Sequence, residues 1–233
     1  YRQAFEAHAA QLQGATVMDI GTGSGILAFL AARYGAKKVY AVEASPDMAR
    51  AASRLARANG LVGVVEVVPK HLQDITDEDI APGSVDVIVS ELFSHFLVGE
   101  VGLQVVTEAK RRFLRPGGLV LPSLARLRLS PFQEPRLRAE LTARSSAFWR
   151  NDDFYGFDLS PVLPQAEEQA LRQNVLDLVD PASLLVPPAE SPGLDLNLAE
   201  PDDPAVWRKI DFEVAFPERH KDAVVDGLCG WWD

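Results

Sequence analysis

The sequence predicts an α/β fold in which a doubly wound parallel sheet precedes an antiparallel, β-rich lobe with a helical insertion. Short β-branched runs alternate with segments of helical periodicity as far as position 121. A glycine cluster separates the first run from the first helical segment, which is typical of a strand-to-helix turn at a ligand site. Beyond Pro122 polar and apolar residues alternate, as they do in antiparallel strands with one face in water.

The N-terminal half alternates strand signals with helix signals. Ser45 and Pro46 are the residue types of an N-cap and a first helical position, and Gly35 suits the end of the preceding helix. The expected strands are residues 15–20, 38–42, 64–68, 85–90 and 119–121, and the expected helices are residues 25–34, 46–59 and 99–114. We therefore expect a Rossmann-like parallel sheet over residues 1–121.

The C-terminal half, residues 122–233, combines expected strands with one helical insertion. The expected strands are residues 126–129, 184–187, 194–198, 210–214 and 224–232, with proline-rich turns between several of them. Residues 135–150 have helical spacing, and residues 151–178 form a mixed segment of helix and loop. These signals predict a second domain, in which a helical segment at about 135–178 interrupts a β-rich lobe.

Composition and charge exclude several classes of protein. With 47% hydrophobic and 24% charged residues, the chain is neither disordered nor collagenous. It has no apolar run of about 18 residues, so we expect no membrane span, and residues 1–14 resemble an amphipathic helix more than a signal peptide. A net charge of −10 disfavours direct nucleic-acid binding and favours cationic partners. The single cysteine, Cys229, indicates a reducing intracellular compartment, cytoplasmic or nuclear.

The glycine cluster after the first expected strand predicts a nucleoside-binding loop. Gly21 and Gly23 allow backbone and ligand to approach closely, although such a turn also needs glycine for structural reasons alone. Ile26 occupies the position where dinucleotide-binding loops have glycine or alanine. Asp19 would repel a pyrophosphate but suits an ammonium group, such as that of S-adenosylmethionine. Glu43, at the end of the second strand, is placed to accept hydrogen bonds from ribose hydroxyls.

Two glutamates frame the loop that follows the fourth expected strand. Glu91 stands at the end of that strand, where ligands bind in parallel sheets, and Glu100 follows after a mostly apolar stretch. A first-turn helix glutamate is the alternative reading of Glu100. Two carboxylates on one apolar loop suit a planar cation such as guanidinium, which carries its hydrogen-bond donors in a fixed fork. The four histidines are scattered without metal-ligand spacing, so we expect no metal site.

Together these motifs resemble the protein arginine methyltransferases. The resemblance is carried by Asp19-Ile20-Gly21-Thr22-Gly23-Ser24-Gly25-Ile26-Leu27, by residues 35–43, by the double-glutamate loop and by Leu114-Arg115-Pro116-Gly117-Gly118. It continues through Pro122, residues 154–160 and residues 227–233, and so covers nearly the whole chain. The resemblance implies a Rossmann-like S-adenosylmethionine-binding domain, a β-barrel substrate domain and a helical dimerisation arm. It also implies methyl transfer from S-adenosylmethionine to arginine in a basic protein substrate, by a homodimer.

The resemblance also assigns roles to individual residues. Glu91 and Glu100 would be the catalytic pair that holds the substrate guanidinium, and Asp19, Gly21, Gly23 and Glu43 would bind the cofactor. Gln73 occupies a position where relatives often have an acid near adenine, and its carbonyl can still accept a hydrogen bond from the exocyclic amine.

Departures from the family pattern leave alternatives open. The family's cofactor-closing N-terminal helix would lie mostly before Tyr1, and its Thr-His-Trp loop would follow Asp233. Gly102 replaces a methionine found in many dimethylating members, so the product is undecided between monomethyl- and dimethylarginine. A catalytically weak or inactive relative, acting as a dimer partner or scaffold, is one alternative function. A small-molecule methyltransferase is another, although it would have no reason for Glu100.

Overall fold

The computed structural model describes residues 1–93, 96–97, 102–199 and 211–233. Two compact units are formed by segments that are not contiguous in sequence. One comprises Tyr1–Leu127, Ser191–Ile210 and Trp232–Asp233, and the other comprises Arg128–Glu190 and Asp211–Trp231. We call them the sheet unit and the arm unit. The expected domain boundary at 121/122 stays a prediction.

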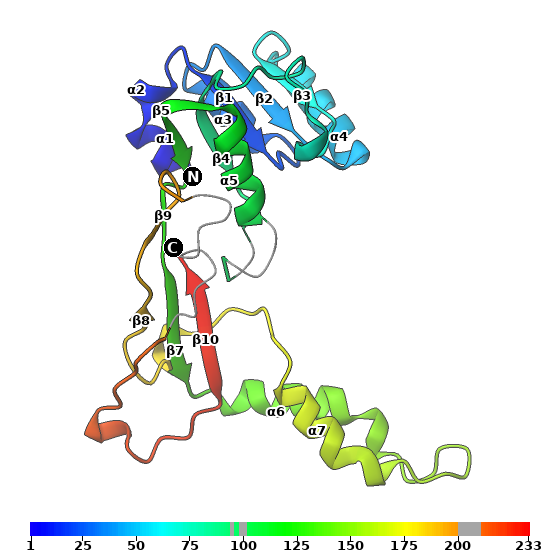
Figure 1. Ribbon diagram of the computed structural model, residues 1–233. Coiled ribbons are helices and arrows are strands. Elements are labelled where there is room, and N and C mark those ends of the chain that lie inside the picture. Colours follow the sequence, from blue (N-terminus) through cyan, green and yellow to red (C-terminus); the bar gives the residue numbers. More distant parts are fainter. Residues whose placement is uncertain (94–95, 98–101, 200–210) are drawn as a thin grey trace. The chain divides into compact units, whose positions relative to one another are not determined.

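The sheet unit is built on the expected parallel sheet, in the order β3-β2-β1-β4-β5 (Figure 1). Its strands are β1 (Thr16–Ile20), β2 (Lys38–Val42), β3 (Val65–Val68), β4 (Val85–Ser90) and β5 (Leu114–Leu121). Every residue of the central strand β1 is buried, because helices and loops leave neither face of a parallel sheet in water. Strand β5 is longer than expected, since Leu114 already pairs with Val85 before a register shift.

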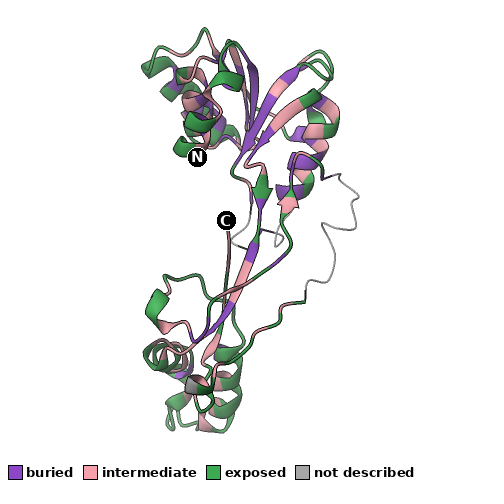
Figure 2. Ribbon diagram, turned by 90° about the vertical axis from the view of Figure 1, so that its left-hand side faces the viewer, coloured by how far each residue is buried: buried purple, intermediate pink, exposed green. Residues whose placement is uncertain are grey.

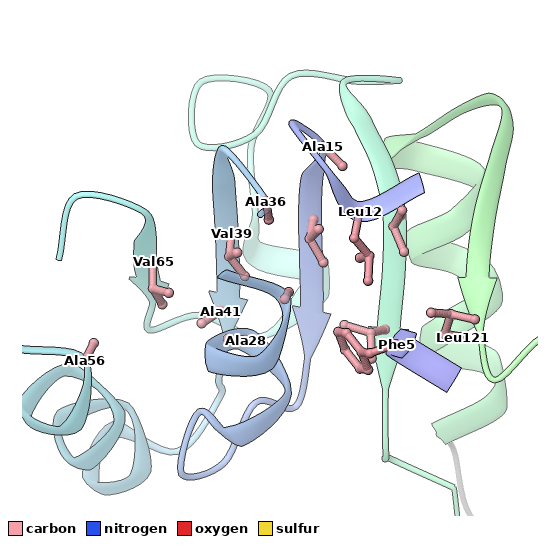
Figure 3. Close-up of a cluster of buried hydrophobic side chains, with 14 residues drawn as sticks. Phe5, Leu12, Ala15, Ala28, Ala36, Val39, Ala41, Ala56, Val65 and Leu121 are labelled. Atoms are coloured by element: carbon pink, nitrogen blue, oxygen red, sulfur yellow. The ribbon is translucent and has the colours of Figure 1, made fainter. Parts of the chain in front are cut away.

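Helices pack on this sheet and complete its core. They are α1 (Arg2–Ala7), α2 (Ala9–Leu12), α3 (Ile26–Arg33), α4 (Pro46–Ala58), the 3-10 turn η1 (Leu72–Asp74) and α5 (Gly102–Phe113). Helix α3 contacts β1 and β2, α4 contacts β3, and α5 contacts β4 and β5. Phe5, Leu12 and Leu121 belong to one buried cluster with the strand valines (Figure 3). The Ser45 cap is confirmed, because its hydroxyl accepts the Met48 amide at 3.5 Å.

A segment from late in the chain returns to the edge of this sheet. The Asn197 side-chain oxygen accepts the amide of Val120 at 2.8 Å, across 77 positions of sequence. The Lys110 ammonium group of α5 donates to the backbone carbonyls of Asn197 at 2.8 Å and Ala199 at 2.5 Å. A short antiparallel pair, β6 (Leu124–Ala125) with β9 (Leu194–Asp195), leads into this contact. The sheet unit is therefore completed only by residues beyond position 190.

The arm unit contains short strands and a helical hairpin. Strands β7 (Leu127–Phe132), β8 (Ala189–Glu190) and β10 (Gly227–Trp232) form a sheet in the order β10-β7-β8. The helices are α6 (Pro135–Ser146) and α7 (Leu163–Leu171), with the 3-10 turns η2 (Phe148–Arg150), η3 (Ser160–Val162), η4 (Pro181–Ser183) and η5 (Glu218–His220). Helices α6 and α7 pack side by side, and their residues are mostly exposed or half-buried (Figure 2).

Three expected strands of the C-terminal half differ in the structure. Residues 184–187 contribute only an isolated bridge between Leu184 and Phe132, because Pro187 and Pro188 have no amide hydrogens to extend a ladder. The strand expected at 194–198 ends at Asp195, whose carbonyl accepts the amides of Leu198 and Ala199 in a turn. Residues 211–214 form no strand, and position 210 lies outside the described residues. Alternating polarity indicates which side chains meet apolar surface, but it does not provide a partner strand.

Candidate active site

The glycine loop between β1 and α3 has the backbone conformation that its sequence requires. Gly21 and Gly23 have φ values of 70° and 55°, in the left-handed region that favours glycine. The amides of Gly21 and Thr22 both donate to the Val42 carbonyl at 2.9 Å, which ties the loop to the end of β2. A Cβ atom at Gly23 would find nothing closer than 4.0 Å, so the loop presents open space there. That space leaves the loop backbone accessible to a ligand, whose close approach stays a prediction.

Asp19, in β1, holds the glycine loop against the start of α3. The residue is 1% exposed, and its Oδ2 accepts the Thr22 hydroxyl at 2.5 Å and the Ala28 amide at 2.9 Å. Its Oδ1 is buried and has no hydrogen-bond partner among the described residues. Burial raises the pKa of Asp19 to about 6, with a smaller contribution from Glu43 and against the effect of the two hydrogen bonds. Oδ1 is therefore the oxygen left for a ligand.

Glu43 joins the glycine loop to the end of the second strand. It is half-buried directly after β2, where its Oε2 accepts the Gly23 amide at 2.9 Å and its Oε1 accepts the Ser45 amide at 2.8 Å. Each carboxylate oxygen has a second lone pair, so both can still accept a hydrogen bond from a ligand hydroxyl. The structure thus brings together four residues of the predicted cofactor set, Asp19, Gly21, Gly23 and Glu43.

Gln73 lies at the surface that η1 shares with α5. It is an exposed residue of η1 and lines a cavity of about 470 Å³ with Gln104 and Glu108 of α5. The guanidinium group of Arg112 donates to the carbonyls of Leu72 at 2.9 Å and Ile75 at 2.5 Å, which fixes η1 against α5. No hydrogen bond within the described part of the chain links Gln73 to the loop, so its role at adenine stays a prediction.

Glu91 stands where the sequence places it, one residue beyond β4 and exposed. The preceding residue, Ser90, is fully buried and pairs with Ile20 at the end of β1. Glu91 therefore lies at the same sheet edge as the glycine loop, which follows Ile20. Glu100 lies outside the described residues, so the paired-carboxylate arrangement stays a prediction.

Gly102, the first residue of α5, approaches the backbone beyond Glu91. A Cβ atom at Gly102 would lie 1.9 Å from the Leu92 carbonyl oxygen, which no side chain permits. The Leu92 side chain in turn covers Gly21, where a Cβ would lie 2.2 Å from Leu92 Cδ2. Leu92 thus connects the start of α5 to the glycine loop.

The sequence analysis assigns no role to three residues that form hydrogen bonds at this site. Thr22 is 7% exposed and bonds Asp19, and its hydroxyl inside the glycine cluster was a usable signal. Ser90 bonds the Ile20 carbonyl through its hydroxyl at 2.8 Å. Tyr1 donates its hydroxyl to the Ser90 carbonyl at 2.7 Å, across 89 positions of sequence. No local pattern indicates a contact of that range.

Metal-binding side chains and membrane-spanning helices were sought in the sequence, and the structure adds two facts about them. Among residues 1–93, 96–97, 102–199 and 211–233, no group of His, Cys, Asp and Glu side chains is arranged to hold a metal ion. In the same residues no helix has the length and hydrophobicity to span a bilayer.

Comparison with known proteins relates the chain to methyltransferases. Residues 17–118 match the family described as Methyltransferase domain. Over the full chain, 33% identity relates it to the probable histone-arginine methyltransferase 1.4 of Arabidopsis thaliana, of which 42% is covered. The probable protein arginine N-methyltransferase 6 of the same plant is 37% identical over the full chain, with 50% of that relative covered. Over its full length, the chain is thus similar to protein arginine methyltransferases.

Solved structures of protein arginine methyltransferases share the fold. Arabidopsis thaliana protein arginine methyltransferase 10 superposes with a TM-score of 0.71 at 33% identity, over 86% of this chain and 59% of that one. The Trypanosoma brucei PRMT1 enzyme-prozyme complex with AdoHcy superposes with a TM-score of 0.70 at 25% identity, over 86% of this chain and 58% of that one. The predicted Rossmann-like parallel sheet with antiparallel strands is confirmed. The chain spans half or less of the length of these curated relatives.

Proposed function

We propose that this chain carries the cofactor site and part of the substrate site of a protein arginine methyltransferase. The enzyme would transfer a methyl group from S-adenosylmethionine to a guanidino nitrogen of arginine in a protein. One observation carries the proposal: Asp19 and Glu43 hold the glycine loop at the same sheet edge that presents Glu91. Similarity to arginine methyltransferases over the full chain supports the same chemistry.

S-adenosylmethionine fits the donor and acceptor groups of the loop. The unpartnered Oδ1 of Asp19 is an acceptor for the ammonium group of the methionine moiety, since a buried carboxylate oxygen without a donor is costly. Glu43 would accept the ribose hydroxyls, and Gln73 would accept the adenine amine. When bound, the cofactor supplies a methyl group already activated on a sulfonium.

Glu91 and Glu100 would bind the guanidinium group of the substrate. Charge-assisted hydrogen bonds from two carboxylates keep positive charge away from the attacking nitrogen and aim that nitrogen at the methyl group. The nitrogen loses a proton after the methyl group has been transferred, so no strong base is needed beforehand. The net charge of −10 favours a basic protein as substrate.

The complete protein would act as a homodimer inside the cell, in the cytoplasm or nucleus. The segment between α6 and α7 exposes aromatic side chains: Phe148 is 51%, Phe157 71% and Tyr155 88% exposed. Phe154 stacks edge-to-face on both Phe148 and Tyr155, so these rings form an ordered apolar surface. A second copy would cover this surface, consistent with the dimerisation arm that the sequence resembles.

A methyl-transfer assay tests the proposal on the natural gene product. Labelled S-adenosylmethionine is offered with a peptide rich in arginine and glycine, and with the same peptide carrying lysine in place of arginine. Label in the arginine peptide alone supports the proposal. Cofactor binding without transfer would instead indicate a dimer partner or scaffold, and transfer only to small molecules would indicate the other alternative.

Substitution of the two glutamates tests their assigned roles. Glu91→Gln and Glu100→Gln each keep the shape and remove the charge that pairs with guanidinium. Each should lower kcat by at least about 100-fold, which corresponds to roughly 3 kcal/mol, while the Kd for S-adenosylhomocysteine stays within about twofold. Near-wild-type turnover by either variant would remove that glutamate from the substrate site.

A further inference from the structure

Tyr1, at the start of α1, contacts the end of β4 next to Glu91. It is the N-cap residue of α1, and its hydroxyl donates to the Ser90 carbonyl at 2.7 Å. Ser90 is fully buried at the end of β4, and its own hydroxyl donates to the Ile20 carbonyl at 2.8 Å. The hydrogen-bonded series Tyr1, Ser90 and Ile20 thus joins α1, β4 and β1 at the point where both ligand loops begin.

The carbonyl that Tyr1 holds belongs to the peptide unit that leads into Glu91. The oxygen of Ser90 and the nitrogen of Glu91 lie in one plane, because the peptide bond between them does not rotate freely. A hydrogen bond to that oxygen therefore restrains the direction in which the Glu91 side chain leaves the backbone. Glu91 is exposed, and no hydrogen bond to another described residue holds its carboxylate.

We propose that Tyr1 is a positioning residue for methyl transfer, whose hydroxyl fixes the Ser90–Glu91 peptide plane and so aims the Glu91 carboxylate at the substrate. The proposal rests on the proposed function of Glu91. With this proposal, the N-cap residue of α1 joins a site whose other residues lie at the ends of strands.

The surroundings of Tyr1 keep its hydroxyl a donor. Burial raises the pKa of this phenol above its ordinary value, and the nearby carboxylates of Glu91 and Asp19 raise it further. The hydroxyl is therefore protonated throughout the physiological range and donates to Ser90 at every working pH.

Packing holds Tyr1 in place, although the residue is 41% exposed. Its backbone carbonyl accepts the amide of Phe5 at 2.9 Å, and the Phe5 ring is fully buried in the core of the sheet unit. The ring of Phe5 also contacts that of Tyr34, with centroids 5.9 Å apart. The first turn of α1, which Phe5 fixes in the core, therefore holds the Tyr1 hydroxyl in position.

Tyr1→Phe tests the proposal, because it removes one oxygen and leaves the ring. Made in the natural gene product, this variant should lower kcat/KM for the arginine peptide about three- to tenfold, the range expected for one hydrogen bond. The Kd for S-adenosylhomocysteine should stay within about twofold. Tyr34→Phe is the matched control, since its hydroxyl bonds the exposed Glu6 at 3.3 Å, and it should change neither quantity.

A double-mutant cycle separates positioning from a general structural role. Peptide binding in the presence of S-adenosylhomocysteine is measured for wild type, Tyr1→Phe, Glu91→Gln and the double variant. If Tyr1 acts through Glu91, the weakening of peptide binding by Tyr1→Phe disappears when Glu91 is already Gln. Wild-type kcat/KM in Tyr1→Phe, or an undiminished effect in the double variant, overturns the proposal. An inactive wild type would instead contradict the proposed function, and the binding cycle would still decide the role of Tyr1.

Discussion

Asp19 gives its two carboxylate oxygens two different tasks. Oδ2 closes the glycine loop through Thr22 and Ala28, whereas Oδ1 has no partner within the described residues. A direct ligand role and a structural role are therefore compatible in one side chain. The two roles respond differently to pH, because only the ionised form attracts an ammonium group.

Ionisation of Asp19 should make the fold less stable as pH rises. Its folded pKa of about 6 lies above the ordinary 3.8, so the folded state binds more protons between these values. The stabilisation is thus fully present below about pH 4 and is lost by about pH 6, and its loss lowers the free energy of unfolding by roughly 2–3 kcal/mol. Urea unfolding of wild type and Asp19→Asn across this range measures it, and parallel pH profiles would contradict the raised pKa.

Removing Glu43 should weaken the cofactor site. Glu43→Ala leaves the amides of Gly23 and Ser45 without their acceptors and removes the predicted partner of the ribose hydroxyls. We expect S-adenosylmethionine affinity to fall by about 1–3 kcal/mol in calorimetry. Glu66→Ala is the control, because this exposed glutamate of β3 pairs with Lys38 at the surface. Equal affinity in a folded Glu43→Ala protein would exclude Glu43 from the site.

At the scale of elements, the positions at which β1, β2 and β4 end could be predicted from the sequence. The hydrogen-bond partners of the residues at those ends could not. Each strand is a β-branched run that ends at a glycine, an acid or a serine, and these local signals placed Asp19, Glu43 and Glu91 correctly along the chain. The bond from Gly23 to Glu43 spans 20 positions, and that from Tyr1 to Ser90 spans 89. The periodicity of a short segment gives no information about contacts between residues so far apart in sequence. The strand expected at 210–214 does not form over its described residues, 211–214, and the reason is the same, since strand pairing is also long-range.

Helix α5 begins where two backbones touch, and this contact can be tested. In Gly102→Ala the new Cβ would lie 1.9 Å from the Leu92 carbonyl, so the helix start or the loop after Glu91 must move. We expect the free energy of unfolding to fall by about 1–3 kcal/mol and methyl transfer to fall with it. Gly63→Ala is the control, because a Cβ there meets nothing within 4 Å. Equal denaturation midpoints for both variants would show that the contact is not close in solution.

At the scale of the whole molecule, the exposed aromatic residues between α6 and α7 predict self-association. Replacing Tyr155 and Phe157 with serine removes the most exposed rings of that surface. In the natural gene product, this double variant should weaken the dimer at least about tenfold in light scattering across a concentration series. Val62→Ser, at an exposed valine of the sheet unit, should leave the dimer unchanged. A monomeric wild type at tens of micromolar would contradict the homodimer.

The hydrogen bond from Val120 to Asn197 determines when β5 can finish folding during translation. Val120 is fully buried in the folded protein. The acceptor of its amide, Asn197, is synthesised 77 residues later. At translation speeds of about 5–20 residues per second, the Val120 amide lacks this acceptor for roughly 4–15 s. An uncovered strand edge can pair with another nascent chain, so this interval is when a chaperone has most to protect. The nucleoside-binding half of this protein therefore cannot finish folding before much of the other half has been made.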